Sequence, residues 1–214
     1  MQRKTIDFLG SFTFIFNDKD WIKKLLITSI FVFLNIFGIC FLVGYMMKLF
    51  VNIRNKKYDP LPQWDDYGEL FKDGLYMILI IFVSVILLGT FEWMLSSIIG
   101  HLGIIGEILN KFVDFIFSVI GFAITTYVFF KYAINRDFNK LFDANSFVEF
   151  MKMNAVNLVL LYMFSILFSL VAASGLLLFI VGIFITAAYS FFGMTYLAAQ
   201  LEDESDVIFS EFVR

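Results

Sequence analysis

The fold of this chain depends on residues 25–53, which read LLITSIFVFLNIFGICFLVGYMMKLFVNI. A straight helix of about 29 residues measures roughly 43 Å, whereas a hydrocarbon core of about 30 Å needs only about 20 residues. The block is therefore too long for one untilted crossing and too short for two. Asn35 and Gly38 lie near its middle and suit a bend, because Asn bonds freed backbone groups and Gly accepts positive φ.

Basic residues flank this block on both sides. Five precede it and four follow it: Arg3, Lys4, Lys19, Lys23, Lys24, then Arg54, Lys56, Lys57 and Lys72. Lys and Arg near span ends mark the cytoplasmic side of a membrane. Since a single crossing would leave one basic flank outside, we expect a re-entrant hairpin that turns between Asn35 and Gly38. One tilted helix, which would give five spans in all, is the alternative.

The amino-acid composition indicates the environment in which the chain folds. Of 214 residues, 60% are hydrophobic and 16% are charged, whereas soluble domains average about half apolar and about a quarter charged. Four more windows are long and apolar enough to cross a bilayer: residues 75–95, 113–132, 156–173 and 176–199. We therefore predict an all-α, polytopic helical membrane protein with four full spans and the N-terminal hairpin.

The remaining segments complete a single integral membrane domain over residues 1–214. We expect short interfacial helices in residues 1–24 and 54–74, and a solvated acidic tail over residues 200–214. Both termini would be cytoplasmic, at a plasma membrane.

Short polar stretches precede three expected helices and predict how these helices begin. Asn17 to Asp20, Asp66 to Glu69 and Ser146 to Glu149 carry N-cap or capping-box patterns. The interfacial anchors and caps that we predict are Trp21, Trp64, Asp65, Asp66 and Ser146. Trp rings lie comfortably at headgroup depth, which is why the two Trp residues are assigned as anchors.

Polar residues within the spans are the candidate site residues, because ionisable groups are costly at membrane depth. The candidates for a substrate site or polar cavity are Asn35, Gly38, Lys48, Glu92, Asp114, Asn154 and Asn157. Glu92 and Asp114 lie near span ends, so solvation at the interface is the simpler interpretation for both.

No catalytic residue, metal ligand set or cofactor motif is predicted. The chain has one Cys and one His, fewer than the four ligands of a structural zinc site. His101 has no nucleophile motif beside it, and a phosphate-binding glycine loop is absent from the sequence. A net charge of −3 argues against nucleic acid as a partner.

Three motifs carry a resemblance to a known family. They are FNDKDWIKKLL from Phe16, the Gly44-Tyr45 pair, and LPQWDDYGELFKDG from Leu61 to Gly74. Together they resemble a prokaryotic membrane family catalogued as domain of unknown function 4013, with a looser match through LFDANSF from Leu141. The resemblance implies a multi-pass membrane protein of a prokaryote and supplies no activity. The family often has Pro in the first block where this chain has Asn35.

Two classes of function follow. The first is a non-enzymatic transporter, pore or membrane subunit of a larger complex, since transporters place their sites at discontinuous helices. The second is a lipid-interacting scaffold, in which Arg54, Lys56 and Lys57 would contact anionic headgroups. A lipid-modifying enzyme is the third possibility. The expected partners are the lipid bilayer and either a second copy or a partner membrane subunit.

Overall fold

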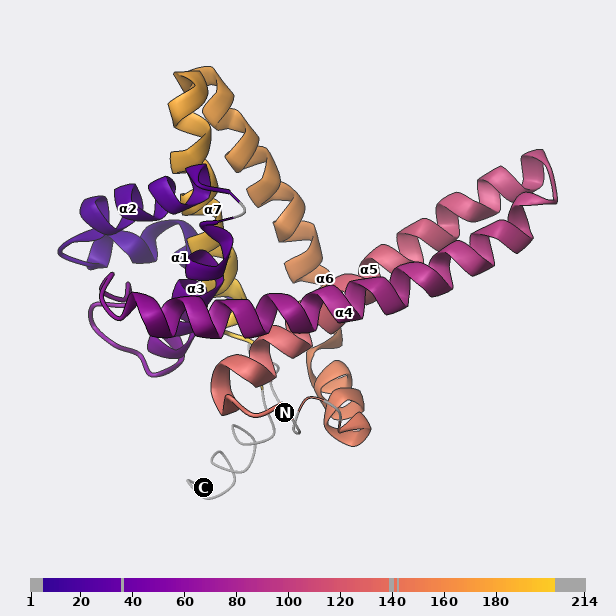
Figure 1. Ribbon diagram of the computed structural model, residues 1–214, viewed down its shortest axis with the longest axis horizontal. Coiled ribbons are helices and arrows are strands. Elements are labelled where there is room, and N and C mark those ends of the chain that lie inside the picture. Colours follow the sequence, from indigo (N-terminus) through magenta and orange to yellow (C-terminus); the bar gives the residue numbers. More distant parts are fainter. Residues whose placement is uncertain (1–5, 36, 139–140, 142, 203–214) are drawn as a thin grey trace.

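The computed structural model describes residues 6–35, 37–138, 141 and 143–202 (Figure 1). Its elements are α1 (Gly10–Thr13), η1 (Phe14–Asn17), α2 (Trp21–Phe33), α3 (Ile39–Arg54), α4 (Tyr67–Gly100), α5 (Ile104–Asn135), α6 (Ala144–Ser174), η3 (Gly175–Leu178) and α7 (Phe179–Ala198). All secondary structure within these residues is helical, which confirms the all-α prediction.

Four helices are long and apolar enough to cross a membrane, as predicted. They are Tyr67–Gly100, Ile104–Asn135, Ala144–Leu177 and Val181–Ala198. Three of them begin earlier than the hydropathy windows. α4 starts at Tyr67, α5 at Ile104 and α6 at Ala144, because none of the added stretches contains a proline and polar side chains on a helix surface do not end a helix. The end of the expected interfacial segment 54–74 is thus the beginning of α4, which continues without a break into the span.

The first hydrophobic block is broken at the predicted place. α2 ends at Phe33 and α3 begins at Ile39, so a single long helix is excluded. Asn35 has a φ of 48°, and its carbonyl accepts hydrogen bonds from the amides of Gly38 and Ile39, both at 2.9 Å. A Cβ on Gly38 would overlap the carbonyl oxygen of Phe31. The turn therefore requires glycine at position 38, whereas its depth in a membrane remains a prediction.

α2 exposes apolar side chains and buries polar ones. Ile22, Leu26 and Ile30 form an exposed stripe along one face. Lys24 and Thr28 are buried on the opposite face, where the Thr28 hydroxyl donates to the Lys24 carbonyl at 2.7 Å. This distribution is the reverse of a helix on a water-soluble protein and suits a helix that faces lipid.

Close backbone contact fixes the crossing of α3 and α4. A Cβ on Gly44 would overlap the carbonyl oxygen of Leu70, and a Cβ on Gly74 would overlap that of Cys40. Small residues at such crossings allow the dense packing that joins helices in a bilayer. Beyond this crossing α4 pairs with α5, and the two helices extend away from the rest of the chain as a long hairpin (Figure 1).

The polar ends of the four long helices meet at one end of the molecule. An ion pair between Asp73 and Arg136 joins the start of α4 to the residue after α5. Asn154, in the first third of α6, bonds the backbone of Glu202 beyond α7. Arg54, at the end of α3, donates to the carbonyl of Leu201 at 2.7 Å. This end is called the polar end below.

The glycine crossing leads to a stability test. Gly74→Ala should destabilise the protein by about 1–3 kcal/mol, because the added methyl group must displace the α3 backbone. Gly89→Ala is the matched control, since a Cβ there meets no atom within 4 Å and Ala favours helix. Thermal unfolding in detergent would measure both. Equal melting temperatures for the two variants would contradict the proposed contact.

Candidate functional site

The loop between α3 and α4 contains a buried segment, Pro60–Pro62, which is called the strap below. Each backbone N–H and C=O group of the strap forms a hydrogen bond with a side chain. Its carbonyls accept from three different residues: Asn52 Nδ2 to Pro60 at 3.1 Å, Lys24 Nζ to Leu61 at 2.7 Å, and Tyr45 Oη to Pro62 at 2.9 Å. The two prolines have no N–H. The one strap amide, that of Leu61, donates to Asp18 Oδ2 at 3.2 Å.

A buried ion pair holds the centre of this arrangement. Lys24 Nζ lies 2.9 and 2.8 Å from the two carboxylate oxygens of Asp18, and the two side chains are only 3% and 1% exposed. The amide of Asp20 also donates to Asp18 Oδ1 at 3.0 Å. Such a buried pair tolerates its desolvation only when the remaining donors and acceptors are bonded, as they are here. Sequence reasoning missed this pair, because it treated Lys24 as a flanking charge and Asp18 as part of a cap.

Trp64, two residues after the strap, packs against the hairpin formed by α2 and α3. Its ring is stacked between Phe31 and Tyr45, with centroid distances of 4.5 and 4.3 Å. The ring expected to be an interfacial anchor thus packs within the protein. Trp21 is half-buried and contacts Phe16 edge to face at 5.0 Å, and its role as an anchor remains a prediction.

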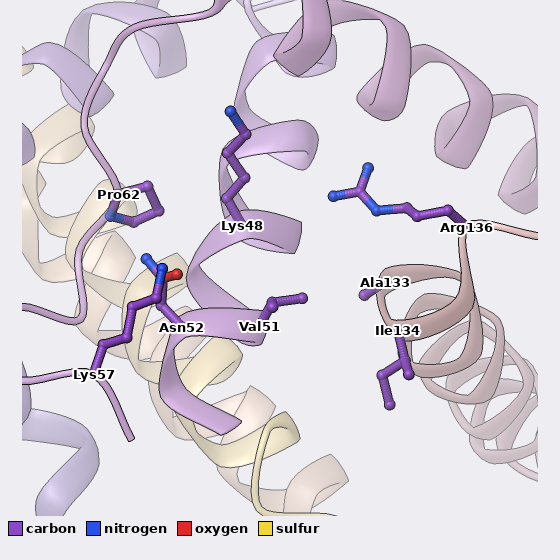
Figure 2. A pocket seen from close by; sticks show the side chains of 8 residues that line it. All are labelled: Lys48, Val51, Asn52, Lys57, Pro62, Ala133, Ile134 and Arg136. Carbon is purple, nitrogen blue, oxygen red and sulfur yellow. The ribbon is translucent and has the colours of Figure 1, made fainter. Parts of the chain in front are cut away.

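Next to the strap lies an open groove of about 460 Å³ at the polar end. Three cationic side chains line it: Lys48 from α3, Lys57 from the loop after α3, and Arg136 from the residue after α5 (Figure 2). Figure 2 shows Arg136 extending across the opening toward α3. The groove is also lined by the apolar side chains of Val51, Pro62, Ala133 and Ile134, which alternate with the cations around the opening, and by the amide of Asn52 (Figure 2). The groove therefore combines cationic donors with a hydrocarbon surface.

Carboxylates on α4 fix two of these cations. Lys48 Nζ lies 3.0 Å from Glu69 and 3.7 Å from the exposed Asp66, and Arg136 pairs with Asp73. Glu69 and Asp73 are four residues apart and so share one face of α4. Partial burial lowers the pKa of Arg136, and the charge of Glu69 opposes that shift; an arginine stays protonated under either influence. The ion pairs therefore orient Lys48 and Arg136 while their other N–H groups remain available.

Lys57 differs from the two oriented cations. It is exposed and has no ion pair among the described residues. The same holds for its neighbour Lys56, which does not line the groove. Of the three cations that line the groove, Lys57 is thus the one without an ion pair in the described part of the chain.

The structure does not gather the predicted cavity residues in one place. Asn35 is exposed at the hairpin turn, and Gly38 serves the packing of that turn. Asn154 is fully buried and bonds the Glu202 backbone twice, at 2.9 Å each. The remaining candidates lie apart from the groove, with Asn157 and Glu92 half-buried and Asp114 exposed. Of the predicted set, only Lys48 lines the groove.

The predicted caps are found in part. Asp66 occupies the N-cap of α4, but its side chain makes no cap hydrogen bond and instead lies 3.7 Å from Lys48; Asp65 is exposed. Ser146 is not the first residue of α6, because Asp143 occupies the N-cap. The Asp143 carboxylate accepts from the Ser146 hydroxyl and the Asn145 amide, both at 3.0 Å, and these bonds lower the pKa of Asp143. The serine-led pattern therefore misplaced the helix start by three residues.

The three predicted headgroup residues have different surroundings. Arg54 donates to the carbonyls of Leu201 and Ala199, and its guanidinium lies 4.8 Å from the Phe130 ring centroid. This side chain is thus engaged inside the protein. Lys56 is exposed outside the groove, and Lys57 lines it.

Comparison with known families accounts for the motifs. A family model described as a protein of unknown function, DUF4013, matches residues 27–187. The chain belongs to this family. The matched region includes Tyr45, the strap and all eight residues that line the groove, and it begins just after Asp18 and Lys24. No curated protein and no solved structure matches the chain. Within the described residues, no group of three or more His, Cys, Asp or Glu could hold a metal ion.

The buried ion pair can be tested by removing its cation. Lys24→Met should destabilise the protein by about 3–5 kcal/mol, because the Asp18 carboxylate and the Leu61 carbonyl would lose their buried donor. Lys23→Met is the matched control, since Lys23 is exposed, and should change stability by no more than about 0.5 kcal/mol. Thermal unfolding in detergent would compare them. A similar small effect of both variants would contradict the buried pair.

Proposed function

We propose that this DUF4013 protein is an integral protein of a prokaryotic plasma membrane that binds the phosphate group of an anionic membrane phospholipid in the groove. The observation that carries the proposal is the groove itself, in which Lys48, Lys57 and Arg136 line the same opening as four apolar side chains. A phospholipid has both a phosphate and hydrocarbon chains, so its chemistry matches both kinds of lining side chain.

Membrane integration is supported by what the helices expose. The four long helices are mostly uncovered within the chain, and their exposed side chains are predominantly large and apolar. The exposed stripe of α2 continues this pattern in the hairpin. We expect the bilayer, together with a second copy or a partner subunit, to cover these surfaces.

The polar end would face the cytoplasm. Lys48, Lys57 and Arg136 are joined there by Arg54 and by Lys72 near the start of α4. Such a concentration of Lys and Arg marks the cytoplasmic side of a membrane protein. Headgroups of the inner leaflet would then lie at the depth of the groove.

Recognition would rest on oriented N–H groups. The Arg136 side chain is 35% exposed and has five N–H donors, of which its carboxylate partner Asp73 cannot use all. Lys48 is held by Glu69 at 3.0 Å with its side chain 21% exposed. Phosphate oxygens accept well from guanidinium and ammonium groups. Lys57 lines the groove and has no ion pair in the described part of the chain. Its charge would favour an anionic lipid over a zwitterionic one.

The arrangement gives less support to transport and to catalysis. A transport site at the broken first element would need polar residues around the turn, and Asn35 is instead exposed there. The residues lining the groove include no hydroxyl, thiol or imidazole that could act as a nucleophile. Binding without chemical conversion is therefore the function we propose.

A single substitution tests the groove. Lys57→Gln should weaken binding of phosphatidylglycerol by roughly tenfold, the loss expected for one charge-assisted hydrogen bond. Titration of the purified full chain in a neutral detergent, followed by native mass spectrometry, would measure the affinity. Inorganic phosphate and phosphatidylcholine added in parallel distinguish a lipid ligand from free phosphate and an anionic headgroup from a zwitterionic one.

The control for this measurement is Lys56→Gln, which removes the same charge from the adjacent residue outside the groove. Its affinity should stay within about twofold of the wild type. An equal loss in both variants would point to diffuse attraction and overturn the groove as the binding site. Saturation by inorganic phosphate alone would overturn the lipid assignment.

The orientation of the protein in the membrane can be tested separately. In a Cys40→Ser background, a single thiol is placed at Tyr58 beside the groove loop or at Leu102 in the α4–α5 turn, where the native side chains are 79% and 59% exposed. A membrane-impermeant maleimide should label Leu102→Cys in intact cells and Tyr58→Cys only after permeabilisation. Labelling of Tyr58→Cys in intact cells would reverse the proposed sidedness.

A further inference from the structure

We propose that Asn52 makes the groove selective for a phospholipid whose headgroup carries a hydroxyl group beside the phosphate. This inference rests on the proposed function, since it concerns the same groove and adds the class of headgroup. Among the residues that line the groove, Asn52 alone has a side-chain hydrogen-bond acceptor, and the end of α3 places it next to Lys57.

The polar lining of the groove consists almost entirely of donors. Its polar side chains are those of Lys48, Lys57, Arg136 and Asn52. Lysine and arginine side chains only donate, whereas an asparagine amide has both an NH₂ group and a carbonyl oxygen. A headgroup that carries a donor of its own therefore finds its acceptor among these side chains at Asn52.

A hydrogen bond to the strap fixes which atom of the Asn52 amide remains for a ligand. Asn52 Nδ2 donates to the Pro60 carbonyl at 3.1 Å. A carbonyl oxygen can only accept, so the amide nitrogen must face the strap and the reversed amide is excluded. Asn52 Oδ1 accepts no hydrogen bond from the described residues. This oxygen is therefore available to a donor in the groove.

The end of α3 places Asn52 beside Lys57. Lys56 has a φ of 50°, and its amide donates to the Ile53 carbonyl at 2.9 Å. The Lys57 amide donates to the Asn52 carbonyl at 3.1 Å. A left-handed residue with these two bonds is a Schellman motif, a common way for a helix to end. The motif joins the backbones of Lys57 and Asn52, and Figure 2 shows both side chains on the same side of the opening.

The charge of Lys57 decides which donor suits this acceptor. A phosphate held by Lys57 would have its headgroup next to Asn52, because the backbones of the two residues are bonded to each other. A headgroup ammonium would meet the positive charge of Lys57 there, whereas a neutral hydroxyl donates to an amide oxygen without that repulsion. The groove thus matches a phosphodiester whose headgroup is a polyol such as glycerol.

The experiment compares two anionic lipids of equal charge. Phosphatidylglycerol and phosphatidylpropanol with the same acyl chains are both phosphodiesters, and the second differs only in lacking the headgroup hydroxyls. Their affinities for the purified full chain are measured by the same native mass spectrometry. The readout is the ratio of the two affinities, because a variant that merely damages the groove or the strap weakens both lipids alike.

The wild type should bind phosphatidylglycerol roughly threefold to tenfold more tightly than phosphatidylpropanol, the gain expected for one hydrogen bond. Asn52→Leu removes the acceptor and should lower this ratio to about one. Asn52→Lys also removes the acceptor but keeps a donor for the Pro60 carbonyl, so it replaces the leucine variant if loss of that bond prevents folding. It should lower the ratio to the same extent.

The matched control is Asn55→Leu, since Asn55 is exposed and does not line the groove. This variant should keep the wild-type ratio. Equal affinity of the wild type for the two lipids would overturn the selectivity. A wild-type ratio in either Asn52 variant, or a loss of the preference in Asn55→Leu, would overturn the assignment to Asn52.

The outcomes separate this inference from the function on which it rests. If Lys57→Gln weakens the binding of both lipids and the wild type does not distinguish them, the selectivity is wrong and the groove stands. If Lys57→Gln weakens the binding of neither lipid, the proposed function itself is wrong.

Discussion

The structure depends on one buried charge pair, Asp18 with Lys24, and on the strap that the pair secures. The three-residue strap contains two prolines and therefore has three carbonyls but a single N–H. It cannot form the regular backbone hydrogen bonds of a helix or a sheet. It can lie buried only if side chains supply the missing partners, and four of them do: Asp18, Lys24, Tyr45 and Asn52. The same contacts join the residues before α2, α2 itself and α3 into one unit. The hairpin is therefore held by side-chain hydrogen bonds as well as by apolar packing.

The groove is a consequence of this unit. Pro62 ends the strap and forms part of the groove wall, and Lys57 lies in the loop that leads into the strap. Lys48 lies one turn beyond Tyr45 on α3, so the helix that anchors the strap also presents the first cation. The Gly44 and Gly74 contacts bring α4 against α3 and thereby place Glu69 beside Lys48. The positions of the residues that line the groove, and of the carboxylate beside Lys48, thus follow from the same packing.

Hydropathy and turn chemistry predicted the architecture, since the four spans and the bend between Asn35 and Gly38 follow from length and residue type. The site did not follow from the same signals. Lys24 looks like any flanking cation, because burial depends on a strap that lies 37 positions away in sequence. Arg136 was not singled out, since its importance comes from a tertiary contact with Asp73. Asn154 resembled a cavity residue but serves the backbone after α7. The two prolines on either side of Leu61 were the available signal for the strap, whereas its hydrogen-bond partners Asn52 and Tyr45 lie 8 and 17 positions away from the carbonyls that they bond.

The packing of α2 and α3 against α7 has a consequence for how the chain is made. The hairpin of α2 and α3 is synthesised before α7, the helix against which it packs. In the hairpin, Met46 of α3 accepts from the Thr195 hydroxyl at 3.3 Å. The segments before the hairpin contact α7 as well, since Phe14 of η1 stacks on Tyr196 at 4.6 Å and Tyr189 donates to the Phe12 carbonyl of α1 at 2.6 Å. Until α7 is synthesised, the early hairpin lacks the surface that completes it. The hairpin can therefore complete its packing only after α7 has been synthesised.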